Sequence, residues 1–168
     1  MRRDVPSIRY AGYVPGAIGM ITECHAVHYH QEWGFDRSFE IQVAAELASF
    51  LDRFQKGRDG LWVGQAGPCF AGSVAVDGSL HDTEGARLRW FIVPAPYHGQ
   101  GIGKHLIQKA LSFCRAAGHD RVFLWTFRGL ERARFLYEQE GFRLTKENEV
   151  EQWGQRIQEQ RFDLVRRT

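Results

Sequence analysis

Two segments of the chain carry apolar side chains at three- and four-residue intervals, which is the pattern of amphipathic helices, and the apolar residues of the segment 15–33 follow this pattern only loosely. The clearest apolar stripe begins at Ile102 and ends at Gly118, a residue suited to the left-handed backbone that follows a helix. Asp36 has a short polar side chain that can cap the first turn of another helix. The pattern predicts helices over residues 15–33, 36–54, 102–117 and 130–140.

Shorter apolar runs, bounded by glycine, proline and charged residues, predict the strands. We expect strands over residues 7–11, 61–65, 69–76, 86–93, 121–126, 142–146 and 157–165. This order of elements predicts an α/β fold, with a mixed central sheet of about seven strands, a parallel centre and about four flanking helices. Nothing in the sequence divides the chain, so we expect a single domain over residues 1–168.

Size and charge narrow the class of protein. The 168 residues, of which 43% are hydrophobic and 25% charged, are enough to bury a sizeable core. A net charge of +2 gives no global field that favours nucleic acid or a membrane surface, so neither is expected as a partner. The basic start Met1-Arg2-Arg3 is followed by Asp4 and not by the apolar core of a secretion signal, and no apolar run approaches the ~20 residues of a membrane span.

The cysteines indicate a reducing compartment. Cys24, Cys69 and Cys114 are odd in number and form no Cys-x-x-Cys pair, which argues against a disulfide framework or a zinc knuckle. Cys24 and His28 stand four residues apart, a spacing compatible with a metal, but solvated helix residues are the simpler interpretation. We therefore expect a cytoplasmic protein without a metal.

A glycine-rich segment lies between a predicted strand and the clearest helix. It reads His98-Gly99-Gln100-Gly101-Ile102-Gly103-Lys104. Glycines let the backbone approach a ligand closely, and a helix N-terminus presents unpaired N–H groups and partial positive charge. The segment therefore predicts a site for an anion such as a pyrophosphate.

Two common phosphate-binding patterns do not match this segment. A Walker loop needs a glycine five residues before its Gly-Lys pair and a serine or threonine after the lysine, where this chain has His98 and His105. The dinucleotide fingerprint needs a third glycine where this chain has Lys104 or Leu106.

The segment resembles the acetyl-CoA loop of the GNAT N-acetyltransferases, in which arginine or glutamine is followed, after two residues, by Gly-x-Gly or Gly-x-Ala. A second segment, residues 132–142, resembles the family's helix that ends in Tyr-Glu-x-x-Gly-Phe. The resemblance spans roughly residues 7–168 and implies the GNAT fold, with acetyl-CoA as acyl donor. Residues 28–43 are similar to the GNAT domains attached to MarR-type regulators.

The resemblance also implies site residues. Tyr137 is the candidate general acid, because a phenol with a pKa of about 10 can protonate a departing thiolate. Backbone groups of Phe91 and Val93 would bind the pantetheine arm as an added strand, and an N–H near Phe91 would polarise the acetyl carbonyl. The expected cofactor-binding residues are Phe91, Val93, His98, Gly99, Gln100, Gly101, Ile102, Gly103 and Lys104.

Two positions depart from the family pattern. His98 replaces the usual arginine or glutamine, so we expect a phosphate contact whose strength depends on pH, with Lys104 supplying the steadier charge. Phe127 stands where related domains often have an asparagine that hydrogen-bonds the cofactor, and Thr126 or Arg128 would have to substitute for it.

The acceptor side is less defined by the sequence. Glu32 or His28 is a candidate base for the amine, while Trp90 and Trp125 are candidates to line the cleft. Arg89 with Trp125 would suit an acidic or aromatic acceptor, although an arginine on a strand is more often solvated.

The expected activity is N-acetylation of a primary amine, carried on a small molecule or a peptide, by direct attack on acetyl-CoA. The alternative is an acyl-CoA sensor or partner-binding module with little turnover. Homodimerisation is an option that the resemblance offers, with Trp153, Ile157 and Phe162 as contributors to the surface.

Overall fold

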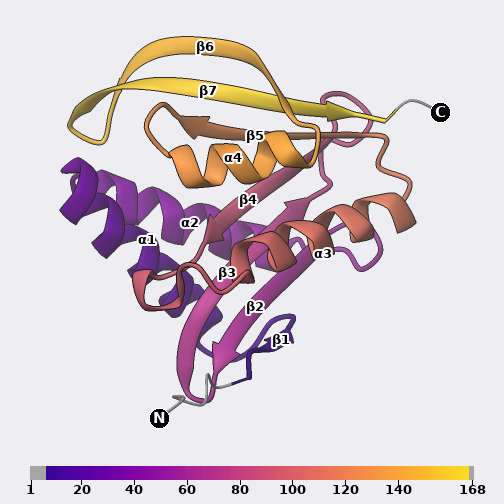
Figure 1. Cartoon of the computed structure of the whole chain (residues 1–168), viewed down its shortest axis with the longest axis horizontal. Helices are drawn as coiled ribbons and strands as arrows, with labels where there is room; N and C mark the ends of the chain where they lie inside the picture. The colour runs from indigo at the N-terminus through magenta and orange to yellow at the C-terminus, as the bar shows by residue number, and fades with distance from the viewer. Residues whose placement is uncertain (1–6, 167–168) are drawn as a thin grey trace.

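A single mixed sheet forms the centre of the molecule in the computed structural model, which describes residues 7–166 (Figure 1). Its strand order is β1-β2-β3-β4-β5-β7-β6. The strands are β1 (Arg9–Ala11), β2 (Gly60–Ala66), β3 (Cys69–Asp77), β4 (Ala86–Ile92), β5 (Arg121–Phe127), β6 (Arg143–Gln152) and β7 (Gln155–Val165). The helices are α1 (Ala17–Trp33), α2 (Arg37–Asp52), α3 (Ile102–Ala116) and α4 (Glu131–Gln139), with a 3-10 turn, η1 (Ala95–Tyr97).

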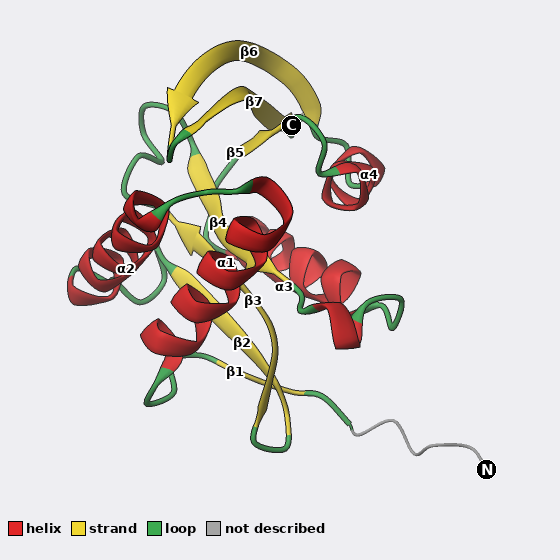
Figure 2. Cartoon of the chain, turned by 90° about the vertical axis from the view of Figure 1, so that its left-hand side faces the viewer, coloured by secondary structure: helices red, strands yellow, loops and turns green. Residues whose placement is uncertain are grey.

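Helices cover both faces of the sheet. Helices α1 and α2 lie on one face, and α3 and α4 lie on the other (Figure 2). Each layer has its own apolar core: Leu106, Ile107 and Leu111 of α3 are buried on one side, while Leu47 and Phe50 of α2 are buried on the other. The predicted α/β architecture is confirmed, with β4 and β5 as the one parallel pair among the described strands.

The local signals that define the helices act as the sequence indicates. The Asp36 carboxylate accepts a hydrogen bond of 2.9 Å from the backbone N–H of Ser38 at the start of α2. Helix α3 begins after Gly101, and Gly118 follows its end in the left-handed conformation, with φ of 76°. Within residues 7–166, no helix is both long enough and apolar enough to cross a membrane.

A bulge in β4 separates this strand from β5. Strand β4 pairs with β5 only from Ala86 to Leu88, although both strands continue beyond this point. The pairing of β4 with β3 changes register next to Trp90, whose φ of 47° is a left-handed value that a tryptophan rarely adopts. The buried Ser73 hydroxyl donates a 2.7 Å hydrogen bond to the Trp90 carbonyl and so holds the bulge in place. The sheet therefore opens between its two central strands.

The last two strands are longer than the sequence pattern predicts. Residues 147–156 continue β6 and β7 and meet in a two-residue turn, in which Trp153 and Gly154 both have positive φ. Strand β6 is the outermost strand and is mostly exposed, so its polar sequence lacks the alternation that would have revealed it. Ile157 and Phe162 are buried in the chain's own core, so the prediction that they form a dimer surface is wrong.

Replacing Ser73 with alanine tests how far the bulge depends on this hydroxyl. Ser73→Ala leaves the buried Trp90 carbonyl without its side-chain donor, which we expect to lower the free energy of unfolding by about 1–3 kcal/mol. Thermal unfolding measures the loss, with the exposed Ser49→Ala as a control that changes stability by less than about 0.5 kcal/mol. Equal melting temperatures for the two variants would show that the bulge holds without this hydrogen bond.

Candidate active site

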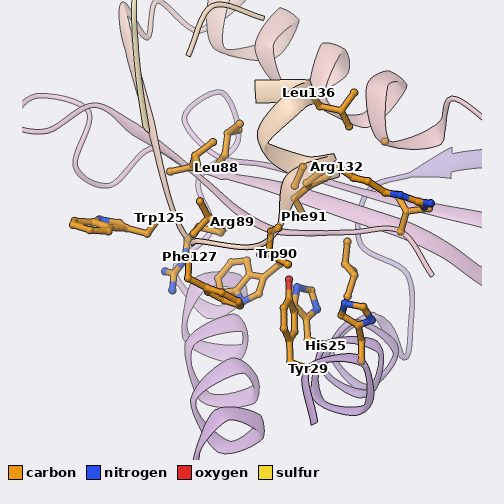
Figure 3. Close-up of a pocket in the computed structure, with 18 of the residues that line it drawn as sticks. His25, Tyr29, Leu88, Arg89, Trp90, Phe91, Trp125, Phe127, Arg132 and Leu136 are labelled. Carbon is orange, nitrogen blue, oxygen red and sulfur yellow. The ribbon is translucent and has the colours of Figure 1, made fainter. Parts of the chain in front are cut away.

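A cleft of about 950 Å³ opens where β4 and β5 separate. Both helical layers contribute to its walls: α1 and α2 on one side, and α3 and α4 on the other. Figure 3 shows Phe91 and Trp90 of β4 between Tyr29 of α1 and Leu136 of α4. The cleft brings together most of the residues that the sequence singles out, since His28, Glu32, Trp90, Trp125 and Tyr137 all line it.

The glycine-rich segment lies at the α3 end of the cleft. Gly99 and Gly101 have φ of 75° and 78°, and no atom outside the local chain lies within 4 Å of where a Cβ would stand, so the backbone faces open space. Gly103 serves packing, because a Cβ there would stand 3.1 Å from the Leu136 Cδ1 atom. Lys104 is in the first turn of α3 and lines the cleft. These features form an open, positively charged cradle for an anion.

Not every residue of the segment faces the cradle. Gln100 does not line the cleft, and its side chain donates a 3.3 Å hydrogen bond to the Pro96 carbonyl. Its expected contact with the cofactor is therefore not supported by the side-chain position.

His98 is held by hydrogen bonds at both ring nitrogens. Arg132, in the first turn of α4, donates from Nη1 to His98 Nδ1 at 2.8 Å, because a guanidinium can only donate. The proton of the imidazole is therefore on Nε2, which donates to the Val93 carbonyl at 2.6 Å. His98 thus connects Val93, the residue after β4, to Arg132. Arg132 is a second cation near the cradle, in addition to Lys104, and the sequence pattern did not indicate its role.

Tyr137 reaches the cleft from α4. Its ring packs 5.9 Å from the ring of Phe91 and 6.0 Å from that of Phe142, and the side chain is nearly fully buried. Its hydroxyl makes no hydrogen bond to any of residues 7–166. Burial, with a smaller effect from the nearby Tyr29 phenol, raises the pKa of Tyr137 far above its usual value. The phenol therefore keeps its proton throughout the neutral range.

His25 and Tyr29 face the cleft from α1, and Figure 3 shows both side chains extending from this helix toward β4. His25 Nδ1–H donates a 2.7 Å hydrogen bond to the Ile21 carbonyl, so Nε2 has no proton in the neutral ring. Burial lowers the pKa of His25 to about 4 and raises that of Tyr29. His25 belongs to the same helix segment as His28 and Glu32, which the sequence favoured as the base, whereas Tyr29 belongs to no motif and was not expected in the cleft.

Comparison with known proteins agrees with this geometry. Residues 23–142 match the family model described as "Acetyltransferase (GNAT) family". This chain belongs to that family. None of the curated proteins compared with this GNAT chain matched it.

Solved structures share the fold of this GNAT chain. A GNAT-family acetyltransferase from Staphylococcus aureus has a TM-score of 0.73 at 17% identity, covering 95% of this chain and 99% of its own. The structure of yncA from Salmonella typhimurium, solved with its cofactor acetyl-CoA, has a TM-score of 0.73 at 15% identity, covering 94% of this chain and 93% of its own. Spermidine N-acetyltransferase from Vibrio cholerae, in complex with CoA and spermine, has a TM-score of 0.69 at 17% identity, covering 94% of this chain and 95% of its own. At these identities the likeness concerns the fold.

The family supplies the activity class: this GNAT protein is an N-acetyltransferase that uses acetyl-CoA. The residues present fit that cofactor. Its phosphates can be bound by the open glycine backbone, the start of α3 and two cations. Its amide-bearing arm can be bound by the edge of β4 that has no strand partner. Within the described part of the chain, no group of three or more His, Cys, Asp or Glu side chains is placed to hold a metal ion.

Phe127 of this GNAT domain has a packing role. Its ring lies 4.9–5.5 Å from those of Tyr29, Trp33 and Phe35, within the aromatic cluster under α1 and α2. Of the two residues expected to replace the missing asparagine, Thr126 lines the cleft, whereas the exposed Arg128 does not and lies 3.8 Å from the Glu147 carboxylate.

Arg89 is not free to bind an acceptor. Its guanidinium pairs with the Glu46 carboxylate, lies 3.4 Å from that of Asp77 and stacks 4.2 Å above the Trp90 ring. Its side chain is only 12% exposed, which excludes the solvated alternative. Trp125 is separated from the other labelled aromatic side chains (Figure 3). Arg89 and Trp125 both line the cleft, but the ion pairs of Arg89 do not support the expected acceptor site.

The buried His25 makes stability depend on pH in a defined direction. Its pKa is about 4 in the folded chain and about 6.5 when unfolded, so the unfolded state binds the proton more tightly. The stabilising contribution is complete above pH 6.5 and decreases as the pH falls toward 4, by about 2 kcal/mol at pH 5. Unfolding by urea at pH 8 and pH 5 measures this loss.

We expect His25→Gln, which cannot titrate, to remove this part of the pH dependence. His81→Gln, the same substitution at an exposed position, is the control for the change of side chain itself. The same pH dependence in wild type and His25→Gln would contradict the lowered pKa.

Proposed function

We propose that this GNAT acetyltransferase transfers acetyl directly to a primary amine. In this proposal the unpaired edge of β4 and the cradle bind acetyl-CoA, and Tyr137 is the general acid. The observation that carries the proposal is the cleft between β4 and β5, with the glycine cradle at one end and the Tyr137 phenol in its wall. The resemblance to related domains assigns the same parts to acetyl-CoA.

The cofactor-holding residues extend from β4 to α4. Beyond Leu88, the edge of β4 that would face β5 has no strand partner, so backbone groups near Phe91 and Val93 are available to an amide-bearing arm. The Val93 carbonyl already accepts from His98, which leaves its N–H as the free group. We assign the phosphates to the amides at the start of α3, with Lys104 and Arg132 supplying charge. In this assignment His98 positions Arg132 and is not the phosphate ligand that the sequence suggested.

The acid and the base come from opposite walls. Acetyl-CoA supplies an acetyl group activated as a thioester. Tyr137 keeps its proton on the hydroxyl and can deliver it to the departing CoA thiolate. The acceptor amine, when it enters as an ammonium ion, must first lose a proton to a base. The candidates for this base on the α1 wall are His25, His28 and Glu32. His25 is the better-ordered candidate, because its ring orientation is fixed by Ile21.

Direct transfer agrees with the state of the cysteines. A covalent acetyl-enzyme formed on a cysteine would need a thiolate beside the cleft. Burial raises the pKa of Cys24 to about 11 and that of Cys114 to about 12, and neither residue lines the cleft. Both thiols are protonated near neutral pH, which supports attack by the amine itself.

Three further properties of the protein are predicted from its sequence alone. These are the cytoplasmic location, the closer relationship with GNAT domains of MarR-type regulators, and homodimerisation. A dimer would need a surface other than that of Ile157 and Phe162. Strand β6, at the sheet edge, carries Glu147, Glu149 and Glu151, and charges of this kind discourage edge-to-edge pairing.

A thermal shift with acetyl-CoA, CoA, ATP and NAD tests the cofactor site. A ligand at 100 times its dissociation constant adds about 2.7 kcal/mol, and we expect this only for the two CoA compounds. Arg132→Gln should weaken CoA binding by about tenfold or more, because it removes a charged hydrogen bond to phosphate. The exposed Arg128→Gln is the matched control and should bind CoA as wild type does. Equal stabilisation by ATP, or unchanged affinity in Arg132→Gln, would contradict the assignment.

Tyr137→Phe tests the acid. The variant keeps the packed ring and loses the proton donor, so we expect turnover with a panel of amines to fall by about 10²-fold or more while CoA still raises the melting temperature. Tyr13→Phe, at an exposed position, is the control. Full turnover in Tyr137→Phe would leave Tyr137 as a packing residue, and a wild-type protein that binds CoA but acetylates no amine would be the sensor.

A further inference from the structure

A cluster of arginines and carboxylates from β3, β4, β7, the C-terminal part of α2 and the loop before β4 lies beside the cleft. Its members are Arg53, Arg87, Arg89, Arg161, Glu46, Asp77, Glu84 and Asp163. Most of the cluster is paired internally: Arg53 with Asp77 at 2.7 Å, Arg161 with Glu84 at 2.6 Å and with Asp163 at 3.0 Å, and Arg89 with Glu46.

Arg87 is the exception in this cluster. It stands on β4 between Asp77 of β3 and Phe123 of β5 in the pairing register, and it lines the cleft. Its Nε is buried and has no hydrogen-bond partner, and its guanidinium makes no hydrogen bond or ion pair with any of residues 7–166. Ser73, one strand away, illustrates the usual arrangement, in which a buried polar group has a partner.

The neighbouring carboxylates do not act as hydrogen-bond acceptors for Arg87. Glu46 is engaged by Arg89, Glu84 by Arg161, and Asp77 by Arg53, Arg89 and the Ser79 hydroxyl. Burial and the adjacent Arg89 lower the pKa of Arg87 to about 10, so the group still carries its charge near neutral pH. A charged guanidinium with five donors is thus presented to the cleft without an acceptor.

The position of Arg87 separates it from the phosphate cradle. The cradle follows the carboxyl end of β4, whereas Arg87 is near the amino end of the same strand. At about 3.3 Å per residue, Arg87 lies roughly 13 Å along the strand from the backbone of Phe91. A molecule whose amine is placed at Phe91 could therefore extend its far end to Arg87.

We propose that Arg87 binds a carboxylate of the acceptor, so that the amine acetylated by this enzyme belongs to an aminocarboxylate such as an amino acid or a peptide. A planar carboxylate matches the two-pronged guanidinium, which favours it over a single-point contact. The inference rests on the proposed acetyl transfer to an amine, and it adds what the far end of that amine must carry.

Matched pairs of acceptors test the proposal. Each pair differs in one carboxylate: 6-aminohexanoate and pentylamine, 4-aminobutyrate and propylamine, phenylalanine and phenethylamine. With saturating acetyl-CoA, we expect wild-type kcat/KM to favour the carboxylate member of at least one pair by about tenfold to a hundredfold. In Arg87→Gln the ratio within that pair should fall to about one, and Arg87→Lys, which keeps the charge but loses the fork, should retain part of it.

The controls separate the role of Arg87 from effects on folding and on chemistry. Arg121→Gln, exposed at the start of β5, should keep the wild-type ratio. The melting temperature of Arg87→Gln should not fall, because no partner is lost. Calorimetric titration of the same pairs into the CoA-bound protein measures carboxylate recognition without turnover, so a protein that binds aminocarboxylates through Arg87 but acetylates none would contradict only the proposed transfer.

Three results would overturn the assignment of Arg87. The first is a wild-type enzyme that shows no preference within any pair. The second is a preference that survives in Arg87→Gln. The third is stronger use of 3-aminopropylphosphonate than of 4-aminobutyrate, which would assign the site to a phosphate-like group.

Discussion

The separation of β4 from β5 after Leu88 is the constraint on which the rest of the structure depends. Two adjacent strands normally satisfy each other's backbone, and here a left-handed Trp90, held by the Ser73 hydroxyl, ends that pairing while both strands continue. The cost is a row of backbone groups without a strand partner. The gain is a cleft in the middle of a sheet, with rigid walls and a ready-made edge for an extended ligand.

The two helical layers give the walls of this cleft different chemistry. The α3 and α4 side carries cations at helix starts, in Lys104 and Arg132, together with a protonated phenol. The α1 side carries the neutral imidazole of His25. An acid and a proton acceptor therefore face each other without sharing a hydrogen bond, and burial shifts their pKa values in opposite directions, so each keeps its form near neutral pH.

Features encoded over a few neighbouring residues could be predicted from the sequence, whereas those that depend on distant contacts could not. The cradle, the cap at Asp36, the end of α3 and the position of Tyr137 in the cleft all follow from local patterns. The tie between His98 and Arg132 joins residues 34 positions apart, and the isolation of Arg87 appears only once its neighbours are seen to be paired elsewhere. The same limit explains Arg89, whose partner Glu46 is 43 positions away.

The Trp153–Gly154 turn has a consequence for how the cleft can change shape. The Trp153 carbonyl accepts from the Asp36 N–H at 3.0 Å, its indole N–H donates to Gln42 at 2.8 Å, and Gln155 donates to the Gly34 carbonyl at 3.3 Å. The tip of the terminal hairpin is thus fastened to the junction of α1 and α2, so these two walls form one frame. Widening the cleft on this side therefore has to move the hairpin and both helices as a unit, whereas the α3 and α4 wall is not held by these hydrogen bonds.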